Sequence, residues 1–162
     1  MLSSKYLVMA ASKIAENEKE YLEKGWIRSW MLFEVQALDK DVCETALKTH
    51  IEKMSKREDV KIMKVDYAKI SKLDPPEQLK KALAAKGIKN LHSQVAEVVV
   101  LTQNFESLVH VVMNYAPTAI EITAPEKIVL TMRDAQHALS NVADMMHKFA
   151  AAGIGGMLIS GE

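Results

Sequence analysis

The fold is decided by the stretch Val95-Ala96-Glu97-Val98-Val99-Val100-Leu101, which is apolar at every position except Glu97. Such a run predicts a central strand covered on both faces, and its β-branched residues favour an extended backbone. Asn104 follows as a helix cap, and residues 105–115 carry apolar side chains at helical spacing. We therefore expect a strand followed by a helix that folds back on it.

The same order of elements occurs 63 residues earlier in the chain. At this offset Phe33-Glu34-Val35 aligns with Ala96-Glu97-Val98, and the cap Asp41 aligns with the cap Asn104. Asp39 is the alternative cap of the first helix. Each helix is followed by a further strand, so the order β-α-β is predicted twice.

Two such units in one chain imply two right-handed crossovers that share one sheet. We predict a ferredoxin-like α+β fold, in which a duplicated β-α-β sandwich carries additional N-terminal, linking and C-terminal helices. A doubly wound parallel sheet is the alternative, although the glycine-rich phosphate loop typical of that fold is missing.

The whole chain, residues 1–162, is expected to form a single α+β domain, because this length is that of one ordinary domain. Its predicted segments are an N-terminal helix (1–25), the first unit (26–70, with a bulge near Met63), a linker helix (71–93), the second unit with a hairpin of strands at 119–123 and 127–130 (94–131), and a C-terminal helix with an apolar tail (132–162).

Composition excludes several classes of protein. Hydrophobic residues make up 49% and charged residues 26%, which rules out a disordered tail or a membrane-embedded chain. No apolar run approaches the roughly 18 residues that span a bilayer. Cys43 is the single cysteine, so an intramolecular disulfide is impossible. With one thiol and no convincing export signal, we expect a cytoplasmic protein.

Charge is unevenly distributed although 21 basic residues balance 21 acidic ones. Residues 48–90 hold twelve basic and six acidic residues, which makes an RNA-binding protein one alternative. The predicted strand 95–101 lacks the aromatic residues that stack on bases. A solvated lysine face is therefore the favoured interpretation, and nucleic acid is not an expected partner.

Motifs for catalysis and for metal binding are missing. Cys43 lies on the expected buried side of its helix, and the glycines at 153–156 follow a helix, whereas a phosphate loop precedes one. None of the five histidines forms an H-x-x-x-H pair. We predict no catalytic residue, no metal and no cofactor.

Some polar residues are nevertheless candidates for ligand binding. Glu34 and Glu97 occupy equivalent positions in the two units, and paired carboxylates can share a proton or bind a cation. Their alternative role is as ordinary carboxylates satisfied by lysines. The remaining candidates are His110 in the second unit and four residues of the C-terminal helix, His137, Asn141, Asp144 and His147.

The C-terminal helix has an unusual composition, because Asp144 and Lys148 are the only charged residues between positions 135 and 152. Its apolar residues are expected to form a core stripe: Ala135, Ala138, Leu139, Val142, Met145, Met146 and Phe149. The opposite face is small and weakly charged, which suits close approach of another surface. The predicted subunit interface comprises Ser140, Ala143 and the tail residues Met157, Leu158 and Ile159. The alternative is that the N-terminal helix covers this face.

These observations predict a non-enzymatic homo-oligomer with an interaction or small-ligand regulatory role. Its ligand would lie at a subunit interface, near the equivalent ends of the two central strands. A small enzyme is the second hypothesis, with a polar site built from Glu97, His110 or the polar face of the C-terminal helix. RNA binding through residues 48–90 is the third.

Overall fold

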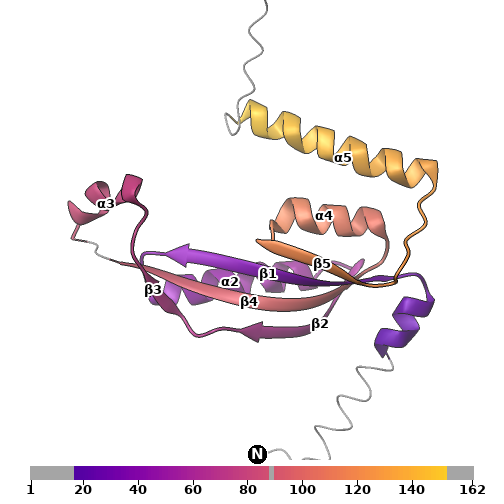
Figure 1. Cartoon of the computed structure of the whole chain (residues 1–162), viewed down its shortest axis with the longest axis horizontal. Helices are drawn as coiled ribbons and strands as arrows, with labels where there is room; N and C mark the ends of the chain where they lie inside the picture. The colour runs from indigo at the N-terminus through magenta and orange to yellow at the C-terminus, as the bar shows by residue number, and fades with distance from the viewer. Residues whose placement is uncertain (1–16, 88–89, 153–162) are drawn as a thin grey trace, which may run out of the picture.

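The computed structural model describes residues 17–87 and 90–152. Residues 17–23 are helical. The elements that follow are β1 (Ile27–Ala37), α2 (Lys40–Ser55), β2 (Val60–Tyr67), β3 (Ser71–Leu73), α3 (Glu77–Ala84), β4 (Leu91–Thr102), α4 (Phe105–Tyr115), β5 (Ala119–Ala124) and α5 (Met132–Ala151). The chain is therefore mixed α+β, as predicted (Figure 1).

All strand pairings in the sheet are antiparallel. The strand order is β2-β4-β1-β5, and the short β3 pairs with β4. The first β-α-β unit contributes β1 and β2, and the second contributes β4 and β5. In the sheet, β4 lies between the two strands of the first unit, and β1 lies between the two strands of the second. The doubly wound parallel alternative is therefore wrong.

The register of the two central strands accounts for the internal repeat. Phe33 of β1 lies directly opposite Ala96 of β4, and the same two residues align at the 63-residue offset. When two antiparallel strands are related by a two-fold axis, equivalent residues face each other where the axis crosses the sheet. The duplication is thus an approximate two-fold symmetry centred on this pair.

Side-chain caps begin the helices that return from the central strands. The carboxylate of Asp39 accepts hydrogen bonds from the backbone N–H groups of Asp41 (2.8 Å) and Val42 (3.1 Å), so Asp39 caps α2 and Asp41 lies in its first turn. Asn104 caps α4 by accepting from the N–H of Ser107 at 2.9 Å. Both helices start where the capping pattern predicts.

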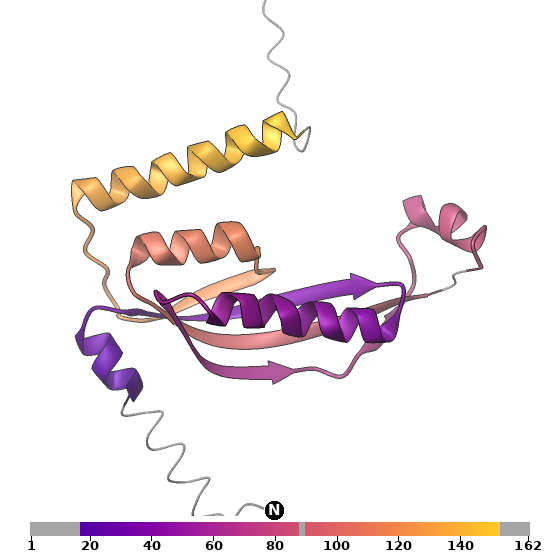
Figure 2. The same ribbon diagram turned by 180° about the vertical axis from the view of Figure 1, so that it is seen from behind.

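The core lies between one face of the sheet and the helices α2 and α4, which Figure 2 shows from the helix side. Alternate residues of β1 and β4 point toward the helices, which bury their apolar stripes against them. The buried core residues are Ile27, Met31, Phe33, Leu47, Ile51, Met54, Val60, Ala96, Val98, Val100, Leu108 and Val111.

Two predicted features of the sheet are wrong. Strand β4 is central, but its second face is not fully covered: Val95 and Val99 are half-buried and Glu97 is exposed. Residues 127–130 do not form a strand, because Ile128 packs against the core while the chain moves outward to α5. The predicted bulge in β2 is confirmed, between Ile62 and Lys64.

Candidate functional site

Helix α5 lies alongside α4, on the far side of α4 from the sheet (Figure 1). The side of α5 that meets α4 is identified by the low exposure of its side chains and by their contact with α4. Ala138 is 7% exposed, and Asn141 and Met145 are half-buried. These residues recur every three or four positions and therefore share one side of the helix.

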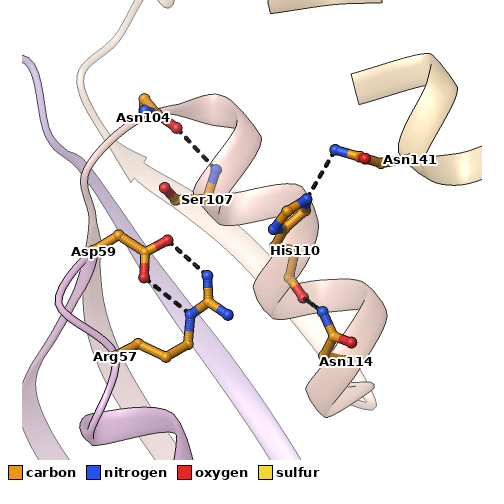
Figure 3. A network of polar contacts seen from close by, with 7 residues as sticks. All are labelled: Arg57, Asp59, Asn104, Ser107, His110, Asn114 and Asn141. Atoms are coloured by element: carbon orange, nitrogen blue, oxygen red, sulfur yellow. Dashed lines mark hydrogen bonds and ion pairs between the residues drawn. The ribbon is translucent and has the colours of Figure 1, made fainter. Parts of the chain in front are cut away.

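A hydrogen bond between His110 and Asn141 joins the two helices. The amide Nδ2 of Asn141 lies 2.8 Å from Nε2 of His110 (Figure 3). The amide N–H of Asn141 donates in this bond, and Nε2 of His110 accepts. The side chain of Asn114 folds back along α4 and donates to the backbone carbonyl of His110 at 2.8 Å.

A hollow of about 220 Å³ opens beside this bond, and we call it the seam hollow. It is lined by His110, Met113 and Asn114 from α4 and by Asn141, Asp144, Met145 and Lys148 from α5. Three of the predicted ligand-binding residues, His110, Asn141 and Asp144, therefore come together. They do so because α4 and α5 pack along their lengths, which a sequence pattern within either helix cannot specify.

Charges of both signs line the rim of the seam hollow. The Lys148 ammonium lies 2.7 Å from the carboxylate of Asp144, one helical turn earlier. The hydrogen bond and positive charge of Lys148 hold the pKa of Asp144 below its ordinary value. Both side chains are mainly exposed, at 71% and 65%. The pair is therefore accessible to a ligand and contributes little to the stability of the fold.

The other predicted residues of α5 do not join the seam hollow. His137 lies 3.8 Å from the carboxylate of Glu106 on α4, a contact that becomes an ion pair when the imidazole is protonated. His147 is exposed and does not line the hollow. The four predicted polar residues of α5 therefore do not form one site. Asn141 and His137 contact α4, Asp144 lines the seam hollow, and His147 is exposed.

Glu34 and Glu97 lie on the sheet face opposite the helices. Glu34 pairs with Val95, so the two carboxylates are diagonal neighbours on adjacent strands. Each has its own hydrogen-bond partners. Glu97 accepts from the indole of Trp30 at 3.1 Å, and Glu34 accepts from Gln36 and Ser93 at 2.9 Å each. The bonds from Gln36 and Ser93 lower the pKa of Glu34. These contacts favour two carboxylates that each have their own hydrogen-bond donors over a Glu34–Glu97 pair that shares one proton.

A polar link at the start of α4 escaped the sequence analysis. Asp59, in the turn after α2, accepts from Nε and Nη2 of Arg57 at 3.0 and 2.7 Å (Figure 3). The nearby hydroxyl of Ser107 also lowers the pKa of the Asp59 carboxyl. The depression beside this pair, lined also by Trp26 and Gln103, is shallow and open. Because Asp59 neutralises Arg57, we assign the link a structural role. Its signal in the sequence is the Arg-x-Asp spacing within a turn.

Only part of the core stripe that the sequence predicts for α5 is buried: Ala138 is buried and Ala135 and Met145 are half-buried, whereas Leu139, Val142, Met146 and Phe149 are exposed. Met132, Ala135, Leu139, Val142, Met146 and Phe149 form a continuous line, which we call the α5 stripe. Its exposed fractions are 87% for Met132, 71% for Leu139, 46% for Val142, 57% for Met146 and 42% for Phe149. The helix buries its Ala138–Asn141–Met145 side on α4 instead, and this turns the α5 stripe toward solvent.

The predicted interface residues have different outcomes. Ser140 and Ala143 are exposed on α5, whereas Met157, Leu158 and Ile159 lie outside the described residues. Ala143 borders the α5 stripe and Ser140 lies away from it. The sequence signal that identifies the stripe is its heptad spacing, with apolar residues at alternating intervals of three and four.

Across residues 17–87 and 90–152, no three His, Cys, Asp or Glu side chains lie close enough to hold a metal ion. Within the same residues, no helix is long and apolar enough to cross a membrane. Cys43 is buried, and its thiol donates to the carbonyl of Val35 at 3.2 Å. Burial raises the pKa of this thiol, which keeps it protonated.

Comparison with known proteins assigns the chain to a family. Residues 28–153 match the model of the MJ0538 family, so the chain belongs to that family. No curated protein and no solved structure was found to match it. The matched region covers every labelled strand and helix except Ile27, the first residue of β1, and carries both the seam hollow and the α5 stripe.

Proposed function

We propose that this member of the MJ0538 family is a non-enzymatic module that binds a small zwitterionic ligand in the seam hollow. The observation that carries the proposal is the convergence of His110, Asn141 and Asp144 between α4 and α5. The sequence singled out these residues as polar candidates for ligand binding, and all three line the same hollow.

The chemistry of the lining indicates the class of ligand. Asp144 offers a negative charge, Lys148 a positive charge, and Asn114 and Asn141 neutral amides. A molecule with both an ammonium and a carboxylate group complements this set. The volume of about 220 Å³ lies below the range of drug-sized sites, roughly 300–1,000 Å³. A free amino acid fits better than a nucleotide.

Binding is favoured over catalysis by the roles that the lining residues already have. Nucleophilic catalysis by a hydroxyl or thiol needs that group beside a free base. The seven lining residues include no serine, threonine or cysteine, and the Nε2 of His110 is engaged by Asn141. The enzyme hypothesis therefore has less support than the binding hypothesis.

The proposal includes a ferredoxin-like fold and a cytoplasmic location. The strand order β2-β4-β1-β5 and the two helices on one face support the fold assignment. The single, buried thiol is compatible with a reducing compartment.

Thermal unfolding in the presence of each free amino acid tests the proposal. A ligand at a hundred times its dissociation constant should stabilise the protein by about 2.7 kcal/mol, which raises the melting temperature by several degrees. Asp144→Asn should weaken this binding at least ~10-fold, since it removes the charge that receives the ammonium group. Glu44→Gln is the matched control, because Glu44 and Lys48 form the same type of pair on α2.

Two results would contradict the proposed amino-acid ligand. If no amino acid at about 10 mM shifts the melting temperature, or if Glu44→Gln weakens binding as much as Asp144→Asn, the ligand assignment is wrong.

A further inference from the structure

The α5 stripe has the spacing of a helix that packs against another helix. Its six residues occupy the two apolar positions of a heptad over almost three repeats, from Met132 to Phe149. In a coiled-coil contact each such side chain fits between four residues of the facing helix. Its five larger members are 42% to 87% exposed, so the described part of the chain leaves a large share of each side chain open to solvent.

The residues that flank the α5 stripe carry no charge. Gln136, Ala143 and Ala150 border it on one side, and Ala138 and Met145 border it on the other. The charged residues of α5 lie at other heptad positions: Arg133, Asp134, Asp144 and Lys148. Flanking charges normally select a partner of opposite charge. Because they are missing here, an identical helix can approach without repulsion, and alanine allows close packing.

We infer that a second copy of this chain docks on the α5 stripe, with its own α5 running antiparallel. A two-fold axis between Val142 and Met146 then places Val142 opposite Met146 and Leu139 opposite Phe149. Each smaller residue meets a larger one, which fills the interface evenly. A parallel pair would instead place Phe149 against Phe149 and Ala135 against Ala135. The antiparallel arrangement also sets the helix dipoles in opposition.

This contact is isologous, since the same surface is used by both copies. It uses a different side of α5 from the seam hollow, so assembly and ligand binding can be tested separately. Failure to bind an amino acid leaves the docking inference intact, and a monomer leaves the ligand proposal intact.

Light scattering during size-exclusion chromatography of the full chain tests the inference. The wild type should have twice the 18.1 kDa mass of one chain. Leu139→Lys and Met146→Lys should each raise the dissociation constant at least ~30-fold, as loss of a central interface residue does. Their melting temperatures at low concentration should match the wild type, because both side chains are exposed in the single chain. Ser140→Lys is the control, since it adds the same charge outside the stripe.

Cross-linking tests the direction of the pairing. A mixture of Leu139→Cys and Phe149→Cys chains should form a mixed disulfide dimer on oxidation, whereas Leu139→Cys alone should not cross-link. The wild type, whose single thiol is the buried Cys43, is the control. The inference is overturned if the wild type is monomeric at high micromolar concentration, if Ser140→Lys separates the copies and Leu139→Lys does not, or if Leu139→Cys cross-links to itself.

Discussion

Asp59 is a single residue that connects the turn after α2 with the segment that leads into α4. Its side chain, 25% exposed, binds Arg57 in its own turn, and its backbone carbonyl accepts from the N–H of Gln103 at 3.0 Å. Burial alone would raise the pKa of its carboxyl. The hydrogen bonds from Arg57 and the nearby hydroxyl of Ser107, with the charge of Arg57, outweigh burial and leave the pKa below its ordinary value.

Because the pKa of Asp59 is lowered in the folded chain, the free energy of unfolding should depend on pH in the acidic range. A carboxyl whose pKa is lower in the folded chain stabilises the fold above its unfolded pKa of about 3.9, and the contribution is lost as the pH falls through the folded value. We predict that Asp59→Asn lowers the free energy of unfolding by about 1–2 kcal/mol at pH 7. Urea titrations at pH 7 and at about pH 3 measure this difference, which should shrink at the lower pH.

Asp66→Asn provides the control for this prediction. Asp66 pairs with Lys64 near the end of β2, but its side chain is 56% exposed. Its loss should cost less than about 0.5 kcal/mol. Equal losses for the two variants, or an Asp59→Asn effect that persists unchanged at low pH, would contradict the role given to Asp59.

At the scale of elements, β4 has the most protected backbone that the sheet offers. It is hydrogen-bonded to β1 on one side and to β2 and β3 on the other. Strand β5 pairs with β1 alone among the described residues and leaves Ile120 and Ile122 41% and 43% exposed. Burial and double pairing should therefore make β4 the last strand to open.

We predict that the amides of residues 98–100 exchange with solvent most slowly in the whole chain, at a rate set by global unfolding. The amides of β5 should exchange at least ~10-fold faster, because an edge strand opens locally. Hydrogen exchange followed by NMR measures both strands in one sample. Rapid exchange at residues 98–100, or equal rates in the two strands, would show that β4 is not the centre of the sheet.

At the scale of the whole molecule, the distribution of charge argues against nucleic acid as a partner. The basic residues of positions 48–90 are spread over α2, β2, β3 and α3, and several have acidic partners, as Arg57 has in Asp59 and Lys64 in Asp66. The open sheet face presents Trp30, but its indole is bound to Glu97, and Glu34 adds negative charge nearby.

We predict no micromolar binding of single-stranded RNA at physiological salt. Fluorescence anisotropy with a labelled oligouridine at about 150 mM KCl measures this, and a titration at about 20 mM KCl reveals any weak, nonspecific attraction. A lysine face without free aromatic side chains gives only weak, nonspecific binding at low salt. Micromolar affinity at the higher salt, falling steeply as salt is added, would restore the RNA-binding hypothesis.

Local patterns identified most of the long elements of this protein, although they missed β3 and predicted a strand at 127–130 that does not form. Hydrophobic alternation identified β1, the run at residues 95–101 identified β4, and Asn104 marked the start of α4. These features are predictable because strand alternation, helix periodicity and capping depend on residues within a few positions of one another. The repeat aligned Phe33 with Ala96, and the structure showed that these two residues pair across β1 and β4.

The tertiary structure alone decided which surface each element meets. Helical spacing shows that α5 has an apolar stripe, but it does not tell whether the stripe faces α4 or solvent. That choice depends on the complementary surface of α4, where His110 receives Asn141. For the same reason, three candidate residues meet in the seam hollow, while Glu34 and Glu97 stay on the far face of the sheet. Contacts between distant segments depend on the shape of both partners, and a pattern within one segment records only its own half.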